Sequence, residues 1–447
     1  MNSKTKTQIS WRLRKGMDRR FRTGHPWVYS NEIIGGPQGI EPGEIVELQD
    51  AGGQFLARGF GNPSSLISFR ALSRDAGVVD PVSGAQLLAL LIQAHGLRVQ
   101  AGFSGVSHRL CFGESDGLPG LIIDRYRVRQ GQVFVVQAHT AGADRLLPRL
   151  FEGFQTFVEQ TQSGQGGRSV EWRNTAVVLR NDVAVRKLEG LPEKESCEIV
   201  KGIPEIELQD CEIAVRSVVD AEPLWFRVDL REGQKTGFFL DQFSNIQIAA
   251  QSFKTFEFGR ARPHAGSDSA PIRILDLCCY VGQWSAQLAA VLTRTGRKVE
   301  VLAVDVSERA LELARHNIEA QGAQCEVLKA HVLKELGDLP ARGFDLVISD
   351  PPALIKGRKD IPVGTHAYLQ LATQVFKWVR PGGGVVCCSC SAWLEEESFI
   401  QAQSKGIQRN RRQVQWISRG SQAPDHPVLA EFPEGRYLKA WIGAVRV

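Results

Sequence analysis

The chain has 447 residues, of which 43% are hydrophobic and 23% charged, with a formal net charge of +5. This length indicates two or three domains, and the composition excludes a disordered or fibrous protein. The sequence contains no run of about 18 apolar residues, which is the length needed to span a membrane. The first residues hold no apolar signal core. We therefore expect a cytoplasmic protein without a membrane partner.

Residues 1–75 alternate short apolar runs with turn signals. The runs EIVEL (44–48), FLARGFG (55–61) and LISFRAL (66–72) are separated by glycine-rich turns. Short strands of this kind predict a small antiparallel β-barrel. We take it as the first domain.

Residues 76–205 mix helical and strand patterns and are predicted to form an α+β middle domain. The run LLALLIQAHGL (87–97) has helical spacing, while LIIDRY (121–126) and VFVVQA (133–138) have the composition of strands. The stretch SGQGGR (163–168) is expected to be a loop.

Residues 206–447 alternate strands and helices after an expected mobile loop at 259–271. Strands are predicted at 272–277, 299–306, 344–350 and 383–389, and helices at 285–294, 309–322 and 367–379. This alternation predicts an α/β domain with a mostly parallel sheet and helices on both faces. Such sheets bind ligands at the carboxyl ends of their strands.

Two segments of the chain are strongly basic. Residues 1–30 contain Asp18 as their only acid beside eight cations, and residues 405–419 contain five cations and no acid. Basic segments on a nearly neutral protein indicate a polyanion partner, although a solvated surface explains them equally well. The cations of the first segment are Lys4, Lys6, Arg12, Arg14, Lys15, Arg19, Arg20 and Arg22.

The first strand of the α/β domain ends in a turn that begins at Asp276 and closes at Gly282. It lacks the GxGxxG pattern that lets the backbone approach a pyrophosphate, so it fits a ligand without phosphates, such as S-adenosylmethionine. Asp305 at the end of the next strand is predicted to bind the ribose hydroxyls. Either acid could instead only cap a helix. Cys278, Tyr280 and His331 complete the predicted cofactor site.

Chemistry is predicted at the ends of the next two strands, at Asp350-Pro351-Pro352-Ala353 and at Cys387 to Ser391. Amine-directed methyltransferases usually carry an aromatic residue where Ala353 stands. A thiolate that adds to carbon 6 of a pyrimidine makes carbon 5 nucleophilic, and Asp350 could stabilise that adduct by hydrogen bonding. Cys390 lies furthest toward the ligand edge, with Cys388 on the same face and Cys387 on the other. A strand-end cysteine can also be simple core filler.

The nine cysteines are expected to be reduced thiols, since adjacent cysteines bridge poorly and no secretory signal is present. Cys387 and Cys390 form a CxxC pair, but no second pair or histidine cluster accompanies them. We therefore predict no metal site.

These residues resemble a family, the RlmI-type 23S ribosomal RNA cytosine-5 methyltransferases of bacteria. The C-terminal half matches in the stretches 226–242, 275–282, 350–354, 389–391 and 425–440. RKG (14–16) and HPWVYS (25–30) resemble its RNA-binding PUA domain, and the stretches 114–126 and 183–192 its middle domain.

The resemblance implies that Cys390 is the nucleophile, that S-adenosylmethionine is the cofactor and that large-subunit ribosomal RNA is the partner. We expect Lys15, Arg19, Arg20 and Arg22 to contact that RNA. The chain departs from the family at Phe243 and Ile246, where arginines are usual, at His331, where an acid is usual, and at Val281 and Gln283. Methylation of another base or position, or RNA binding without catalysis, are the alternative functions.

Overall fold

The computed structural model describes residues 9–161, 171–192, 197–256, 258, 270–336 and 339–446. Lys4, Lys6, the predicted loop 163–168 and most of the predicted loop 259–271 lie outside these residues. Contacts divide the chain into two compact units, which are Met1–Ala214, Asp229–Gly237 and Pro424–Gly435 in the first, and Val215–Val228, Phe238–Ala423 and Arg436–Val447 in the second. No helix among the described residues is long and apolar enough to cross a membrane.

The N-terminal part of the first unit is a five-stranded sheet of order β1-β3-β4-β5-β2, packed around a core that includes Trp11, Phe21 and Phe69. Most pairs are antiparallel, as expected, but β1 runs parallel to β3. The chain passes through α1 and β2 between them, a connection long enough for a parallel pair. The elements are β1 (Ser10–Arg12), α1 (Arg19–Arg22), β2 (Trp27–Tyr29), β3 (Ile45–Gln49), β4 (Phe55–Gly61) and β5 (Ile67–Ser73).

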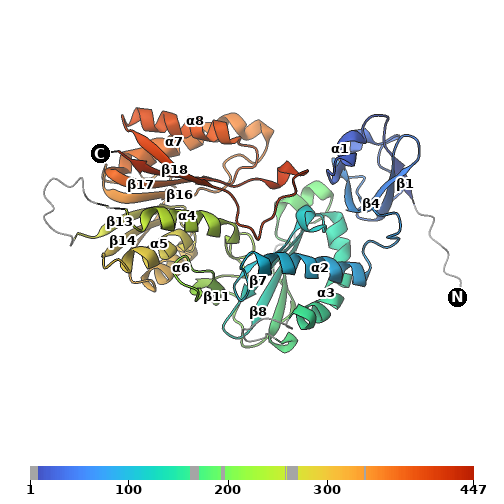
Figure 1. Ribbon diagram of the computed structural model, residues 1–447, viewed down its shortest axis with the longest axis horizontal. Coiled ribbons are helices and arrows are strands. Elements are labelled where there is room, and N and C mark those ends of the chain that lie inside the picture. The colour runs from blue at the N-terminus through green and yellow to red at the C-terminus, as the bar shows by residue number, and fades with distance from the viewer. Residues whose placement is uncertain are drawn as a thin grey trace. The chain divides into compact units, whose positions relative to one another are not determined.

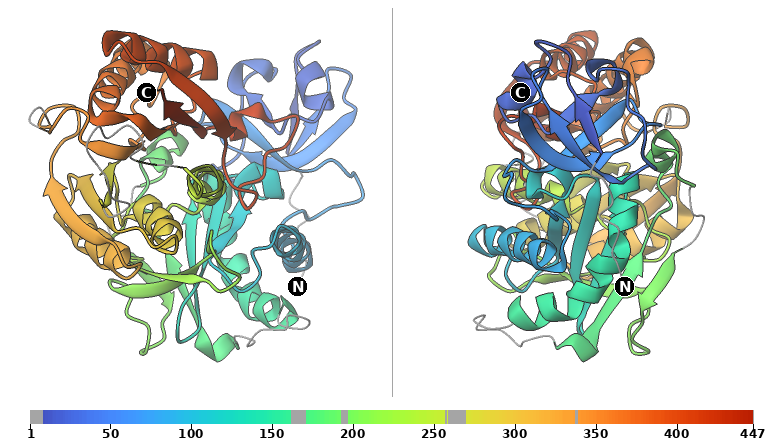
Figure 2. Two further views of the ribbon diagram at one scale, coloured as in Figure 1. Left: turned by 60° about the vertical axis from the view of Figure 1, so that its left-hand side comes forward. Right: turned by 90° about the vertical axis from the view of Figure 1, so that its right-hand side faces the viewer.

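A second five-stranded sheet, of order β10-β9-β8-β7-β6, follows in the first unit together with two helices (Figure 2). The predicted helix 87–97 is present within the longer α2, whose first turn is capped by the Ser83 side chain. The elements are α2 (Gly84–Gln100), β6 (His108–Phe112), β7 (Leu121–Arg127), β8 (Gln132–Ala138), α3 (Ala141–Thr161), β9 (Thr175–Leu179) and β10 (Glu198–Lys201).

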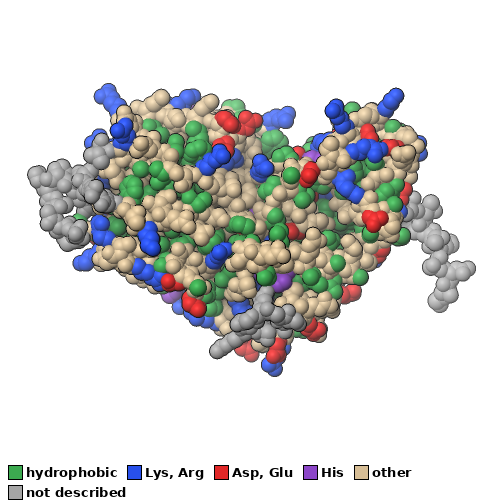
Figure 3. Space-filling model, in the orientation of Figure 1, with side chains coloured by type: hydrophobic (Ala, Val, Ile, Leu, Met, Phe, Trp, Pro, Cys, Tyr) green, Lys and Arg blue, Asp and Glu red, His purple; other side chains and the backbone are tan. Residues whose placement is uncertain are grey.

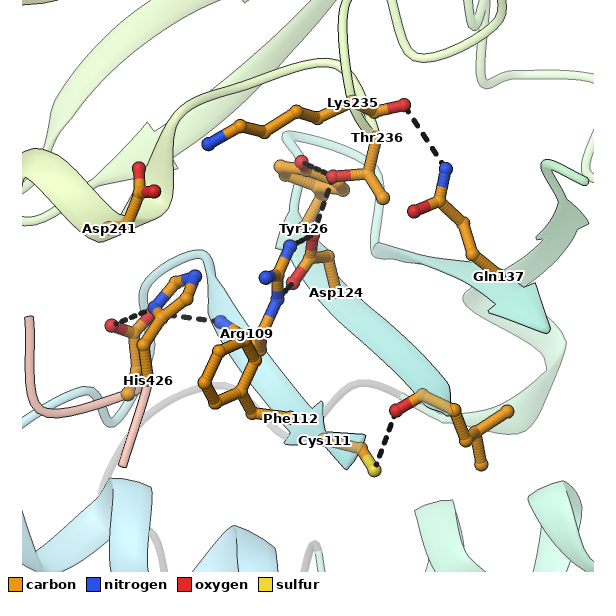
Figure 4. Close-up of polar contacts among 12 residues, drawn as sticks. Arg109, Cys111, Phe112, Asp124, Tyr126, Gln137, Lys235, Thr236, Asp241 and His426 are labelled. Carbon is orange, nitrogen blue, oxygen red and sulfur yellow. Dashed lines mark hydrogen bonds and ion pairs between the residues drawn. The ribbon is translucent and has the colours of Figure 1, made fainter. Parts of the chain in front are cut away.

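A buried polar network ties the returning segment Asp229–Gly237 to this sheet (Figure 4). Arg109 on β6 donates to both carboxylate oxygens of Asp124 on β7, at 2.8 Å each. The Thr236 hydroxyl donates to the same carboxylate and lies 2.8 Å from the Tyr126 hydroxyl. A buried ion pair is costly unless further hydrogen bonds satisfy it. Thr236 supplies such a bond to the buried Asp124 carboxylate, and this contact joins the segment to the sheet.

The second unit contains a seven-stranded sheet of order β15-β14-β13-β16-β17-β19-β18. The strands from β15 to β17 are parallel, and β19 is antiparallel to both of its neighbours. Helices cover both faces, with α7 and α8 on one side and α4, α5 and α6 on the other (Figure 1). This is the predicted α/β arrangement, and it aligns four strand ends at one edge.

The predicted strand 272–277 coincides with β13, and the predicted helix 367–379 begins earlier, at Ile361. The strands are β13 (Ile272–Leu277), β14 (Val299–Asp305), β15 (Gln324–Lys329), β16 (Phe344–Ser349), β17 (Val379–Ser389), β18 (Val414–Gly420) and β19 (Lys439–Val445). The helices are α4 (Phe243–Phe253), α5 (Gln283–Thr293), α6 (Glu308–Glu319), α7 (Ile361–Trp378) and α8 (Glu396–Arg409). The short strands β11 (Cys211–Val215) and β12 (Leu224–Val228) precede them in the chain.

Candidate functional site

The carboxyl ends of β14, β13, β16 and β17 lie next to one another and carry the predicted chemical residues. Leu277 at the end of β13 is in register with Val304 of β14 and with Ser349 of β16, which is in register with Cys387 of β17. Asp276, Asp305, Asp350 and Cys390 are therefore brought to one edge of one sheet. The pairing of the four strands thus brings the predicted site residues together.

The turn after β13 has an unusual backbone. Cys278, Tyr280 and Gly282 have φ angles of 59°, 49° and 75°. A positive φ is strained for residues with a side chain and often accompanies a ligand site. A Cβ atom at Gly282 would lie 3.0 Å from Ile318, so α5 begins there with glycine for both conformation and space.

Asp305 fixes this turn. One carboxylate oxygen accepts the Tyr280 amide at 3.0 Å, and the other accepts the Ser307 amide at 2.9 Å, before α6 begins. Asp305 therefore has a structural part in the turn and at the start of α6. Its predicted contact with the ribose would be added to these bonds.

Asp276 is wholly buried and lies near two other acids. Burial, followed by the charges of Asp350 and Asp305, raises the pKa of Asp276 to about 7, although a hydrogen bond from Ser285 lowers it. Its Oδ1 atom has no hydrogen-bond partner in the part of the chain that the structure describes. An orphaned oxygen amid converging carboxylates fits a cationic ligand.

Asp350 is oriented by two side chains that the sequence reasoning missed. Its Oδ2 atom accepts the Gln242 amide at 2.7 Å and the Trp284 indole N–H at 3.0 Å. Asn245 donates to Gln242 in turn, at 2.7 Å. Gln242 belongs to a stretch already singled out by its resemblance, which was the available signal.

Cys390 follows the last residue of β17 and is partly buried, with its Sγ atom 3.7 Å from the carbonyl oxygen of Pro351. Cys387 and Cys388 are both buried. Cys387 belongs to a core that includes Phe399 of α8, on the helix side, as expected. Burial raises the pKa of Cys387 to about 12 and holds the pKa of Cys388 well above its usual value, so neither thiol ionises readily.

Lys439 is a third residue that the sequence reasoning missed. It is paired with Ser389 across β17 and β19, and its ammonium donates to the carbonyl oxygens of Ser391 and Tyr437 at 3.0 and 3.1 Å. Burial lowers the pKa of Lys439, while the charge of Cys390 raises it. The ammonium and the thiol are therefore electrostatically coupled, and a cation there favours thiolate.

The departures from the family pattern have definite places. Phe243 and Ile246 are buried in α4. His331 follows β15, where its imidazole accepts the Leu333 amide at 3.3 Å. Gln283 is buried at the start of α5.

The four predicted RNA contacts belong to the first unit. Lys15 and Arg19 are exposed, whereas Arg20 pairs with Glu32 at 3.3 Å and Arg22 with Asp50 at 2.6 Å. Figure 3 shows basic and acidic side chains interspersed where α1 and β4 lie.

The chain has known relatives over nearly its full length. Residues 12–74 match a PUA-like domain and residues 268–431 a methyltransferase domain. Ribosomal RNA large subunit methyltransferase I of Erwinia tasmaniensis is 30% identical over 96% of this chain and 97% of the relative. The protein of that name from Photobacterium profundum is 32% identical, again over 96% and 97%. A solved methyltransferase complexed with SAH superposes with a TM-score of 0.70 at 15% identity, over 98% of this chain and 100% of that chain.

The fold and the matched domains define an S-adenosylmethionine-dependent methyltransferase. Within that class, the chain belongs to the ribosomal RNA large subunit methyltransferase I family. The residues present fit the cofactor, because Asp276 offers a buried unpaired oxygen to a ligand that carries a sulfonium and an ammonium. As predicted from the sequence, the chain resembles this family from its N-terminal sheet to its last strand.

Proposed function

We propose that this protein methylates carbon 5 of a cytosine in large-subunit ribosomal RNA through a covalent adduct with Cys390. The observation that carries the proposal is the position of Cys390, within 3.7 Å of Pro351 in the Asp350-Pro351-Pro352 turn and coupled to the Lys439 ammonium. The names of its relatives support the RNA substrate.

In this mechanism the Cys390 thiolate adds to carbon 6 of the ring, and carbon 5 gains the electron pair of the former double bond. The cofactor supplies an electrophilic methyl group. Carbon 5 then loses its proton, the double bond re-forms and the Cys390 thiolate leaves. Asp350, held by Gln242 and Trp284, is positioned to hydrogen-bond the ring. A base in a helix must first be unstacked to reach such a site.

In the proposed cofactor site, Asp305 binds the ribose hydroxyls and the turn residues Cys278, Tyr280 and Gly282 lie against the ligand. His331 stands beyond β15, where the family usually has an acid. In the first unit, the N-terminal domain of residues 1–75 binds RNA. The proposed domain boundaries fall between residues 75 and 76 and between residues 205 and 206. A cytoplasmic location is also proposed, since the relatives are named for ribosomal RNA.

The test uses the trapping chemistry of the carbon-5 route. In the presence of cofactor, a substrate RNA containing 5-fluorocytosine should form an adduct with the wild-type enzyme that resists denaturation, because carbon 5 then carries fluorine in place of the proton whose loss would release Cys390. Cys390→Ala should form no adduct and transfer no methyl group, yet bind cofactor normally. Cys388→Ala is the matched control and should still trap. Robust methyl transfer by Cys390→Ala would overturn the covalent mechanism and favour methylation of an exocyclic amine.

A further inference from the structure

Two loops beside the proposed nucleophile are locked together. One follows β16 and contains residues 350–360, and the other follows β17 and contains residues 390–395. The Ile355 amide donates to the Ser391 hydroxyl at 3.1 Å, and the Tyr368 hydroxyl lies 3.0 Å from the same oxygen. The two loops therefore present their side chains as one ordered surface.

Trp393 is the large aromatic residue of this surface. Its side chain is 48% exposed, although the neighbouring Leu394 and Ser391 are buried. Arg358 of the other loop places its guanidinium 5.9 Å from the centre of the Trp393 ring. A cation over an indole face orients the ring without removing it from solvent. A tryptophan that an anchored loop holds half-exposed is available to contact a ligand.

The loop after Pro352 is basic, whereas the residues that follow Trp393 include the exposed acids Glu395 and Glu397. Lys356, Arg358 and Lys359 are exposed on the loop after Pro352. None of them forms an ion pair with another residue that the structure describes. Unneutralised cations beside an exposed aromatic ring are the combination by which proteins hold single-stranded nucleic acid, through phosphate contacts and base stacking.

The short chain separation from Cys390 keeps Trp393 near the proposed nucleophile. Trp393 is separated from Cys390 by three peptide units, so their Cα atoms lie at most about 11 Å apart. The ring is therefore within reach of the nucleotide next to one held at Cys390. When a base leaves its stack, the neighbouring base loses its stacking partner on one face, and an aromatic side chain can cover that face.

We propose that Trp393 and Arg358 form a stacking platform for the unpaired RNA base adjacent to the methylated nucleotide. The inference rests on the proposed RNA methylation and assigns the platform to substrate positioning, not to the chemical step. Stacking on Trp393 holds the flanking base while Lys356 and Lys359 contact the backbone phosphates.

The experiment compares Trp393→Ala, Trp393→Phe and wild type on large-subunit ribosomal RNA transcribed in vitro. Trp393→Ala should weaken RNA binding and raise KM on the order of ten- to hundred-fold, as loss of one stacked base does. Its affinity for S-adenosylmethionine should be unchanged. Trp393→Phe should restore most of the loss, because it keeps an aromatic face. Arg358→Ala should have a smaller effect in the same direction.

Ile417→Ala is the matched control, since Ile417 is also apolar and 45% exposed but lies on β18. RNA affinity is measured by equilibrium binding without cofactor, so it does not depend on methyl transfer. Weaker binding by Trp393→Ala in a protein that never methylates RNA would support base stacking on Trp393, but it would refute the proposed function and the assignment of that base to the neighbour of a methylated nucleotide. Active enzyme with equal RNA affinity and KM in wild type and Trp393→Ala would refute the platform alone.

Discussion

The Asp276 carboxyl group is buried near Asp305 and Asp350, and its pKa is raised to about 7, first by burial. Below that pH the free protein holds a proton on Asp276, whereas a bound cation favours the carboxylate. Affinity for S-adenosylmethionine should therefore rise with pH toward about 7, by up to about tenfold per unit, and level off above it. Calorimetry in two buffers of different ionisation enthalpy should show a proton released at low pH. A pH-independent affinity would contradict this linkage.

Lys439 provides a second test at the residue scale. Its ammonium is coupled to Cys390, so Lys439→Gln should shift the acid limb of the activity profile to higher pH, because the thiolate loses a favourable charge. Glutamine keeps two N–H donors for the Ser391 and Tyr437 carbonyl groups. Alkylation of Cys390 as a function of pH measures the same change directly. Lys329→Gln, at an exposed ion pair with Glu308, is the control. Superimposable profiles for Lys439→Gln and wild type would exclude the coupling.

The sequence could point to Cys390 and Asp350, because a residue's position just after an apolar strand is a local property. Lys439 and Gln242 could not be given roles in the same way. Lys439 reaches the site only because β19 pairs antiparallel with β17, with Lys439 opposite Ser389. Gln242 contacts Asp350 across more than a hundred residues of chain. Such long-range contacts leave no periodic signal.

At the scale of elements, strands were easier to delimit than helices. The strand 272–277 ends at Leu277, where the chain enters the turn, and its bounds follow from apolar residues that are interrupted only by Arg273 and Asp276. For α7 the predicted helix begins at 367, but the helix starts at Ile361, because proline is accepted in the first turn. Pro362 therefore marks the beginning of α7 and does not interrupt a helix.

Replacing a helical glycine with alanine should change the free energy of unfolding in opposite directions at Gly406, where α8 packs against α7, and at Gly96 in α2. A Cβ atom at Gly406 of α8 would lie 2.7 Å from Ala372 Cβ and 2.8 Å from its backbone carbon. Gly406→Ala should thus lower stability by about 1–3 kcal/mol through overpacking, despite alanine's better helix propensity. Gly96 in α2 has no atom within 4 Å of its hypothetical Cβ, so Gly96→Ala should raise stability by about 0.4–1 kcal/mol.

Urea unfolding of both variants and wild type measures these changes. Since the two substitutions are chemically identical, any difference in sign reflects the local space. Stabilisation by Gly406→Ala would mean that α7 and α8 are less closely packed than the structure has them.

At the scale of the whole molecule, the chain returns to its first unit twice, at Asp229–Gly237 and at Pro424–Gly435. The Asp425 side chain accepts the Arg109 amide at 2.9 Å, and its carbonyl oxygen accepts from Arg98 at 2.8 Å. From sequence alone, residues 206–447 read as one continuous domain, because nothing local distinguishes these short returning segments. Their partners are fixed by buried polar contacts, which a hydrophobicity pattern does not record.

The RNA binding that we propose for the N-terminal sheet is also tested at the scale of the whole molecule. Lys15 and Arg19 are exposed and have no ion pair within the described residues, whereas Arg22 lies between Asp18 and Asp50. A cation that is already paired with carboxylates neutralises a phosphate less well, so it displaces fewer of the counterions condensed on the RNA. Replacing Lys15 and Arg19 with alanine should therefore reduce the slope of log affinity against log salt by about 1.4–1.8, at about 0.7–0.9 per phosphate contact.

Arg22→Ala is the control and should change that slope by much less than the roughly 0.7–0.9 expected for one phosphate contact, although it removes a positive charge from the same short segment. The measurement is RNA binding by full-length protein at several salt concentrations, with cofactor absent. An unchanged slope for the Lys15 and Arg19 double variant would show that these side chains do not meet phosphates. A large change for Arg22→Ala alone would instead mean that its pairs with Asp18 and Asp50 open when RNA binds, as exposed ion pairs of small net energy can.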